Sequence, residues 1–438
     1  TLGLFNYITA IAGYFTLFAS LGFPIYGIRE VAQSKDDPDK LQSATNAIFT
    51  ANILACLVVY AVYFIASLFL AHSEQDFWLY FVLGLSVLLS CISFDWFYQG
   101  VEDFKYITIR SIAIKLISIV CLFIFVRTHE DILPYAILTI AGTCGNNILN
   151  LIRIRKYIKL KISFLDCWKH TKGASVLFLG TIAVSLYTNL NSVMVGALGT
   201  MAAVAFFTTG NKLVQMLMTV LGAITSSIIP RMAYLVGKGD EKEAIALQKK
   251  TLNLLLYVSI PMVFGIIALA HPLILLFGGK EFLPAVPVMQ ILSTLLVIIT
   301  LSGFLGNQIL IPMHKEKYGN YCVGGGAIAN LIVNFILIPL FAEIGVAIAV
   351  VIAETVVTAM HFYFAHRYMK LKWKDFVPVK CILASILMFL VIVVSYSNDI
   401  SPLYCFLWAI MGMIVYVLSL LGLRDQYFKE TILKLIKR

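Results

Sequence analysis

The chain has 438 residues, of which 60% are hydrophobic and only 13% are charged, and its mean hydropathy is +0.91. A typical soluble domain is about 45–50% apolar and about 25% charged, so a chain this apolar cannot cover its own surface with polar groups. The composition therefore argues against a water-soluble enzyme. It also argues against a nucleic-acid binder, despite a formal net charge of +10.

Long apolar runs separated by short polar loops follow one another along the whole chain. A membrane-spanning helix needs about 20 mostly apolar residues. The runs are continuous and lack the alternation of barrel strands, and in lipid a helix then remains as the way to satisfy every backbone group. We predict thirteen spans, at residues 2–27, 45–70, 77–98, 107–126, 132–151, 173–196, 201–229, 251–277, 284–312, 319–340, 343–365, 377–396 and 402–423.

The basic residues predict how these spans are oriented. With thirteen spans, all lysines and arginines but four fall into loops on one side of the membrane. Arg127 and Lys280 lie on the other side, and Lys115 and Lys212 lie within spans. Because basic loops stay in the cytoplasm, this side is cytoplasmic and so is the C-terminus. The first residue then lies on the far side, so we expect one further span before it and fourteen in the full-length protein.

A weak internal repeat predicts two lobes. Phe5 matches Phe207 and Arg29 matches Arg231 at an offset of 202 residues, and Lys105 matches Lys317 at an offset of 212. Two pseudo-symmetric six-helix lobes related by an axis along the membrane normal would produce such a repeat; loops with the same topological role could also match by chance. The predicted division is an N-terminal lobe over 1–162, a C-terminal lobe over 163–372, and two additional spans with a cytoplasmic tail over 373–438. The predicted fold class is thus an all-α polytopic helical bundle.

Two stretches carry a resemblance to a known family. One is the run Asp-Trp-Phe-Tyr-Gln-Gly-Val-Glu-Asp-Phe at residues 95–104, and the other is the opening stretch from Leu2 to Glu30. Both resemble the bacterial polysaccharide repeat-unit flippases, the Wzx-type translocases of O-antigen and capsule. These belong to the multidrug/oligosaccharidyl-lipid/polysaccharide exporter superfamily.

The resemblance implies a transporter of the bacterial cytoplasmic (inner) membrane. Such a flippase moves undecaprenyl-pyrophosphate-linked oligosaccharide from the inner to the outer leaflet by alternating access, and ion-gradient coupling is expected. Its implied partners are the lipid-linked oligosaccharide, membrane lipids and the polysaccharide polymerase machinery, with no nucleic acid. In relatives with fourteen spans the last two can help to form a groove for the lipid tail. No cofactor or metal is predicted, because the cysteines occur singly in apolar runs and no Walker pattern is present.

The anionic pyrophosphate of such a cargo calls for cations within the spans, where charges are costly and usually functional. Lys212 is the first candidate, on a polar stripe with Thr208, Asn211 and Gln215, although it could instead form a structural ion pair. Lys115 lies near the middle of its span. Arg110 lies nearer the cytoplasmic end, where it could equally reach out to lipid headgroups.

Acidic residues within spans are candidates for ion coupling. Glu354 lies at mid-span, with His361 on the same helical face. A carboxylate in a span can exchange protons, but Glu354 could also serve as the ion-pair partner of Lys212. Asp95 is the third candidate, and it could instead organise the following turn with Arg110.

Amide and aromatic residues within spans mark faces that turn away from lipid. Glycan hydroxyls need such partners, and aromatic rings can stack on sugar faces. For any single residue, a hydrogen bond between helices is the simpler explanation. The predicted lining residues are Asn211, Gln215, Tyr187, Asn191, Asn330 and Asn334.

Two other functions remain open from the sequence. A cation-coupled drug or metabolite exporter of the same superfamily would use the same acids and fewer cavity cations. A membrane-bound polysaccharide polymerase or glycosyltransferase is less favoured. Polymerases typically have a large outer loop, whereas the predicted outer loops here are very short, and no acidic catalytic motif occupies the inner loops.

Overall fold

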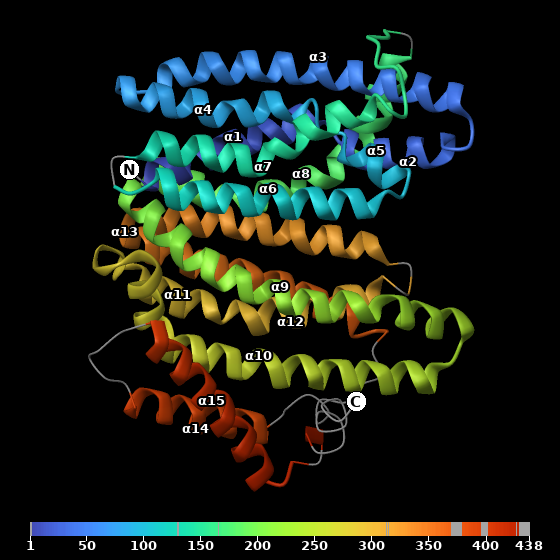
Figure 1. Cartoon of the computed structure of the whole chain (residues 1–438). Coiled ribbons are helices and arrows are strands. Elements are labelled where there is room, and N and C mark those ends of the chain that lie inside the picture. The colour runs from blue at the N-terminus through green and yellow to red at the C-terminus, as the bar shows by residue number, and fades with distance from the viewer. Residues whose placement is uncertain are drawn as a thin grey trace. The chain divides into compact units, whose positions relative to one another are not determined.

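The computed structural model describes residues 2–128, 131–164, 166–311, 313, 315–368, 379–395, 402–425 and 427–428. In these ranges every regular element is a helix (Figure 1). Ten helices there are long and apolar enough to cross a membrane, judged by length and composition. The chain packs into two units: unit 1 comprises Thr1–Gly196, and unit 2 comprises Ala197–Arg438. The predicted all-α membrane fold is confirmed.

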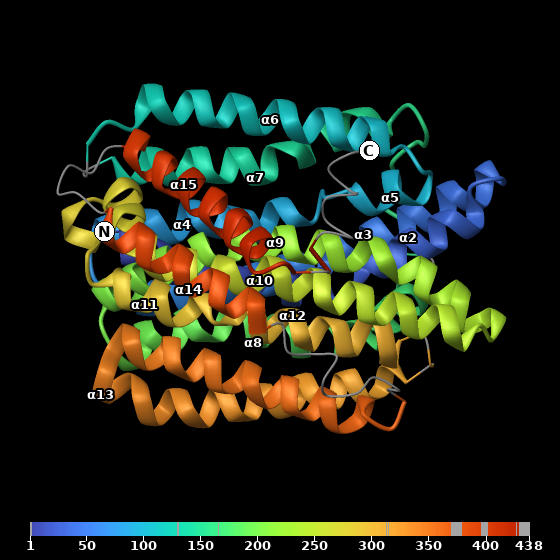
Figure 2. The same ribbon diagram turned by 90° about the horizontal axis from the view of Figure 1, so that it is seen from below.

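Unit 1 is a bundle of long helices joined by short connections. Helices α3 and α4 lie side by side in Figure 1, and α6 lies along α7 in Figure 2. The helices are α1 (Leu2–Ser20), α2 (Phe23–Ser34), α3 (Pro38–Leu70), α4 (Glu74–Ser90), α5 (Asp95–Gly100), α6 (Phe104–Phe125), α7 (Ile132–Ile154) and α8 (Cys167–Leu198).

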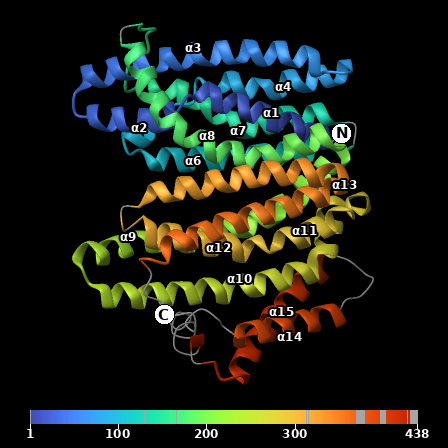
Figure 3. The same cartoon turned by 180° about the vertical axis from the view of Figure 1, so that it is seen from behind.

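Unit 2 contains the remaining helices, and its last two pack together against α10, as Figure 3 shows. The Tyr257 hydroxyl of α10 donates to Asp425 Oδ2 at 2.7 Å just beyond α15, which ties the end of this pair to α10. The elements are α9 (Met201–Lys238), α10 (Glu241–Gly278), η1 (Lys280–Phe282), α11 (Ala285–Ser293), α12 (Leu295–Leu305), η2 (Gly306–Leu310), α13 (Glu316–Ala365), α14 (Val379–Val394) and α15 (Pro402–Gly422).

Each predicted span corresponds to helical structure. The predicted spans 319–340 and 343–365 both lie within α13, which is broken at Ala342, where φ is 45° and ψ is −119°. The spans 173–196 and 377–396 correspond to α8 and α14.

The predicted spans 2–27 and 77–98 each fall within a candidate span of the structure, but each consists of two helices separated by a break. The first run breaks at Leu21 and Gly22, where φ is 42° and 77°, and the second breaks between Ser90 and Asp95. A side chain at Gly22 would place its Cβ 2.6 Å from the Ala174 carbonyl oxygen, so glycine is required here for its positive φ and for the close approach of α8. Both breaks bring short helices, α2 and α5, to the same end of unit 1.

The basic segment that follows α7 is extended along α3 rather than helical. Three polar side chains one turn apart on α3 satisfy its backbone at alternate residues: Gln42 accepts from Lys159 N at 3.3 Å, Asn46 from Lys161 N at 3.1 Å, and Thr50 from Ser163 N at 2.9 Å. This pairing leaves the lysines exposed, in keeping with contact to headgroups or water.

Helix α8 packs with unit 1. The Tyr26 hydroxyl lies 2.9 Å from His170 Nδ1, and the ring centroids of Phe18 and Phe178 are 5.8 Å apart. The predicted boundary after residue 162 instead assigns this helix to the second lobe. The division into symmetric lobes therefore stays a prediction.

The start of α3 predicts a pH effect. Asp37 caps this helix by accepting from Asp39 N and Lys40 N, both at 3.2 Å. The bond from the Lys40 backbone lowers the pKa of Asp37 below its usual value of 3.8. A lowered folded-state pKa stabilises the fold above pH 3.8, and this contribution is lost as the pH falls through the folded-state pKa. We expect amide exchange in the first turn of α3, corrected for intrinsic rate, to become a few-fold faster below this pH. In the Asp37→Asn variant the exchange should show no such step.

Candidate functional site

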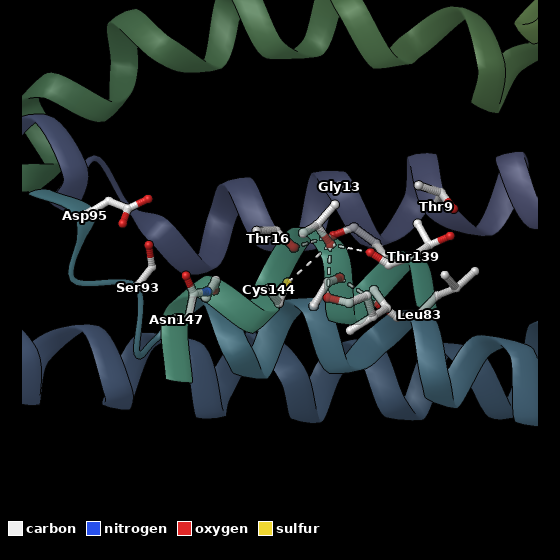
Figure 4. Close-up of a pocket in the computed structure, with 14 residues that line it drawn as sticks. Thr9, Gly13, Thr16, Leu83, Ser93, Asp95, Thr139, Cys144 and Asn147 are labelled. Atoms are coloured by element: carbon white, nitrogen blue, oxygen red, sulfur yellow. Dashed lines mark hydrogen bonds between the residues drawn. The ribbon is translucent and has the colours of Figure 1, made fainter. Parts of the chain in front are cut away.

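A pocket with hydroxyl groups on a partly apolar wall lies in unit 1 between α1, α4 and α7. Its volume is about 420 Å³. Figure 4 shows Asp95 and Ser93 at one end and Thr9 at the other. Seven hydroxyl groups line it, from Thr9, Thr16, Ser86, Ser90, Ser93, Thr139 and Thr143. We call this cavity the hydroxyl pocket.

Most of these hydroxyl groups already donate within their own helix. The Thr9 hydroxyl donates to Phe5 O at 2.7 Å, and the Thr139 hydroxyl donates to Tyr135 O at 2.7 Å. The hydroxyls of Thr16, Ser86, Ser90 and Thr143 do the same to carbonyls three or four residues earlier. Each hydroxyl then keeps lone pairs to accept from a ligand.

Asp95 is the one charged residue among the described lining residues. Its Oδ1 accepts from Arg110 Nη2 at 2.8 Å and from Asn150 Nδ2 at 2.7 Å, and Arg110 Nη1 also donates to Asn150 Oδ1. The Arg110 side chain is 2% exposed, whereas that of Asp95 is 40% exposed. Arg110 and Asn150 therefore hold one oxygen of the carboxylate, and Asp95 also lines the pocket.

The distinctive motif of the sequence holds Asp95 in place. Trp96, Phe97 and Tyr98 follow it in α5, and all three are buried. Helix α2 approaches α5 so closely that a Cβ on Gly27 would lie 2.4 Å from the Trp96 ring. The Tyr98 hydroxyl donates to Asn150 O at 2.9 Å and joins α5 to α7. The aromatic run is thus a packing anchor, and its first residue is delivered to the pocket.

The second half of the motif begins α6. Asp103 caps this helix by accepting from Tyr106 N at 3.3 Å, and its Oδ2 accepts from Arg153 Nη2 at 2.6 Å. The Arg153 guanidinium also lies 3.8 Å from the centre of the Tyr106 ring. These contacts fix the first turn of α6 and hence the depth of Arg110.

The three predicted cations occupy different environments. Arg110 is the only buried residue of α6, and it is turned inward to Asp95, so the expectation that it reaches out to headgroups is wrong. The alternative expectation that Asp95 and Arg110 pair is confirmed. Lys115 on α6 and Lys212 on α9 are both exposed. Among the described residues that line the hydroxyl pocket, none is a lysine or an arginine.

The predicted polar lining residues are spread over both units. Thr208 is buried, Asn211 is half-buried, and Lys212 and Gln215 are exposed, so the stripe on α9 turns from the interior outward. Asn330 and Asn334 are fully buried and joined by a 3.0 Å bond from Asn334 Nδ2 to Asn330 Oδ1. Asn191 is buried in α8, and the side chain of Tyr187 lies outside the described part of the chain.

The ion-coupling candidates also divide between the units. Asp95 belongs to unit 1, whereas Glu354 and His361 belong to α13 of unit 2. Glu354 is half-buried, and His361 is buried with its Nδ1 2.9 Å from Ser302 Oγ on α12. Glu354 and His361 share a face of α13, as predicted, but the structure draws His361 into a contact with α12.

The sequence analysis missed the hydroxyl lining. A signal was present, because Ser86, Ser90 and Ser93 follow the i, i+4, i+7 spacing of one helical face, and Thr139 and Thr143 are one turn apart. Hydroxyls in spans commonly bond to their own backbone, which makes the pattern easy to pass over. A smaller cavity of about 170 Å³ in unit 2, with Thr225, Thr300 and Asn307 on its wall, was also unforeseen.

A family model and two curated relatives that match this chain are described as a polysaccharide biosynthesis protein, a transporter and a flippase. The family model described as "Polysaccharide biosynthesis protein" matches residues 1–236, and the MatE model matches residues 177–336. The chain is similar to the "Putative O-antigen transporter" of Escherichia coli (strain K12), with 27% identity over 383 residues that cover 83% of this chain and 88% of the relative. It is 22% identical over 259 residues to the "Probable low-salt glycan biosynthesis flippase Agl15" of Haloferax volcanii, covering 58% of this chain and 54% of the relative.

Solved structures share the fold. The lipid II flippase MurJ in an inward closed conformation has a TM-score of 0.73 at 16% identity, covering 97% of this chain and 96% of its own. An inward-facing multidrug resistance MATE family transporter of the MOP superfamily has a TM-score of 0.62 at 12% identity, covering 84% and 93%. At these identities the likeness concerns the fold alone.

Proposed function

The chain belongs to the polysaccharide biosynthesis protein family, and from this membership we propose that it is a flippase that carries lipid-linked oligosaccharide across the membrane. It is a multi-pass membrane transporter and not an enzyme. The single observation that carries the proposal is the similarity to an O-antigen transporter over 83% of this chain and 88% of that relative.

The physical demand of this task is to move a polar head group through hydrocarbon. Each polar group without a partner in lipid costs several kcal/mol, so the protein must offer a polar path. A hydroxyl-lined cavity with one carboxylate, set among apolar helices, is the kind of interior that such a path needs.

We propose the cargo, the direction of transport and the residue roles as the sequence analysis predicts them. The cargo is an undecaprenyl-pyrophosphate-linked repeat unit of O-antigen or capsule type, moved from the inner to the outer leaflet of the bacterial cytoplasmic membrane by alternating access of two lobes. Lys212 and Lys115 contact the pyrophosphate, and Glu354, His361 and Asp95 are candidates for coupling to an ion gradient. The basic loops and the C-terminus face the cytoplasm. Polysaccharide polymerase machinery uses the product.

The match of residues 177–336 to the MatE model favours a second candidate, a cation-coupled drug or metabolite exporter. The two differ in cargo. Only the flippase requires a polyprenyl-linked ligand, and only the exporter would change the sensitivity of cells to small toxic compounds.

The test is removal of this gene from its host. We expect a lipid-linked oligosaccharide to accumulate on the inner leaflet, detected by mass spectrometry of extracted lipids, and surface glycan to fall by more than about tenfold. Restoring the gene should clear the accumulated lipid. Unchanged lipid-linked glycan together with raised drug sensitivity would instead favour the exporter.

A further inference from the structure

The polar atoms of the hydroxyl pocket are mostly hydrogen-bond acceptors. Six of the seven hydroxyls donate their hydrogen bond to a carbonyl oxygen of their own helix. Asn147 Nδ2 donates one of its two hydrogens to Leu89 O at 2.8 Å, and its Oδ1 can accept from a ligand. An ionised carboxylate accepts only, and this is the state in which Asp95 pairs with Arg110. A ligand that suits this wall must bring the donors.

We propose that the hydroxyl pocket binds the sugar portion of the cargo, that the Asp95 carboxylate accepts from glycan hydroxyls, and that the pyrophosphate is held elsewhere. This inference rests on the proposed function, because a glycan is a ligand here only if the chain carries one. Sugar hydroxyls supply many donors in a small volume, which is the complement of this wall.

The same wall disfavours the pyrophosphate. An ionised pyrophosphate offers acceptors and no donors, so it would face a row of acceptors and the negative charge of Asp95. Arg110 cannot compensate, because its side chain is 2% exposed and its Nη2 already binds Asp95. The predicted cations Lys115 and Lys212 remain for the phosphates, and neither lines this pocket.

The size of the pocket favours a sugar over a bare ion. At about 420 Å³ it falls within the range of about 300–1,000 Å³ that small-molecule sites occupy. Six of the hydroxyls come from three helices and that of Ser93 follows α4, so that the pocket extends from Asp95 to Thr9 (Figure 4), which suits a ligand with donors around its edge.

Arg110 and Asn150 act as positioning residues. They bind Oδ1 at 2.8 and 2.7 Å and thereby hold the carboxylate in one orientation with its charge balanced. Charge-assisted bonds of this kind are stronger than neutral ones and leave the other oxygen ready to accept.

The test uses the glycan that this protein would carry. The lipid-linked intermediate that accumulates in cells without this gene is treated with mild acid, which cleaves the sugar-phosphate bond and frees the oligosaccharide. Binding of this oligosaccharide, of inorganic pyrophosphate and of sodium ion to the purified full chain in detergent is measured by calorimetry. If nothing accumulates, the proposed function fails at this earlier step, which separates that failure from a failure of the pocket.

Two variants test the pocket, and one serves as the control. Asp95→Asn removes the charged acceptor, and Thr139→Val removes a hydroxyl while it leaves the contacts of Asp95 intact. Glu102→Gln makes the same carboxylate-to-amide change at an exposed residue paired with Lys35, outside the pocket. Melting temperatures of all three are measured alongside, so that Thr139→Val decides the matter if Asp95→Asn does not fold.

We expect oligosaccharide binding to weaken at least tenfold in Asp95→Asn and about threefold or more in Thr139→Val, with no change in Glu102→Gln. Pyrophosphate binding should stay the same in all variants. The inference is overturned if the wild-type chain does not bind the oligosaccharide, or if both pocket variants bind it normally. It is also overturned if the substitutions weaken pyrophosphate or sodium binding instead.

Discussion

Replacing Arg110 by methionine is expected to lower the stability of the protein more than any other single charge removal in unit 1. The arginine is 4% exposed and donates to both Asp95 and Asn150. Methionine keeps the apolar stem but leaves the carboxylate without its cation. Loss of charge-assisted bonds at a buried pair costs about 2–3 kcal/mol, somewhat less than for a fully enclosed partner because the Asp95 side chain is 40% exposed.

A loss of this size should lower the melting temperature in detergent by about 5–10 °C, at roughly 2–4 °C per kcal/mol for a unit of this length.

Arg29→Met is the matched control, because Arg29 pairs with Glu30 at 3.4 Å and its side chain is 53% exposed. Its melting temperature should stay within about 2 °C of the wild type. The double variant Arg110→Met/Asp95→Asn should regain part of the loss, since no charge is then left unbalanced. Equal melting temperatures for Arg110→Met and the wild type would show that the pair does not stabilise the unit.

Lys212→Ala is expected to reduce surface glycan by more than about tenfold while the amount of protein in the membrane stays normal. The proposed reason is the loss of a positive charge that contacts the pyrophosphate within the span. Each 1.4 kcal/mol of attraction that is lost corresponds to about a tenfold loss of affinity. Lys115→Ala should impair export as well.

Lys212→Arg retains the charge and is the matched control, so most of the export should remain. Glycan display is measured on whole cells, and protein is quantified in isolated membranes. Normal display in Lys212→Ala would contradict the cargo role. Equal loss in the alanine and arginine variants would point to the shape of the lysine rather than its charge.

The fold was largely predictable because lipid imposes a simple rule on sequence. A run of about 20 apolar residues must form a helix in lipid to satisfy its backbone. The predicted span 132–151 ends three residues before the end of α7, and the predicted span 251–277 begins about three turns after the start of α10. Breaks inside an apolar run were not predictable from hydropathy. They depend on tertiary approach, as at Gly22, where the backbone of α8 leaves no space for a side chain.

The candidate site was predictable only in part, for a related reason. Spacing tells which residues share a face of a helix but not what that face meets. Arg110 was correctly placed as a charged residue in a span, yet its partner Asn150 comes from α7, 40 residues further along the chain. The hydroxyls of Thr9, Ser86 and Thr139 form a wall only when three helices converge, and no single helix carries that information.

The hydrogen bonds that the pocket hydroxyls make within their own helices bear on how a transporter returns to its starting state after it has released its cargo. Six of its seven serine and threonine hydroxyls donate to carbonyls of their own helices, and these bonds do not require a ligand. Release of the ligand would therefore leave few donors without a partner, and water can satisfy the acceptor lone pairs. The return of the empty transporter to its starting conformation would then cost little free energy at this pocket, and another step would limit the rate of transport.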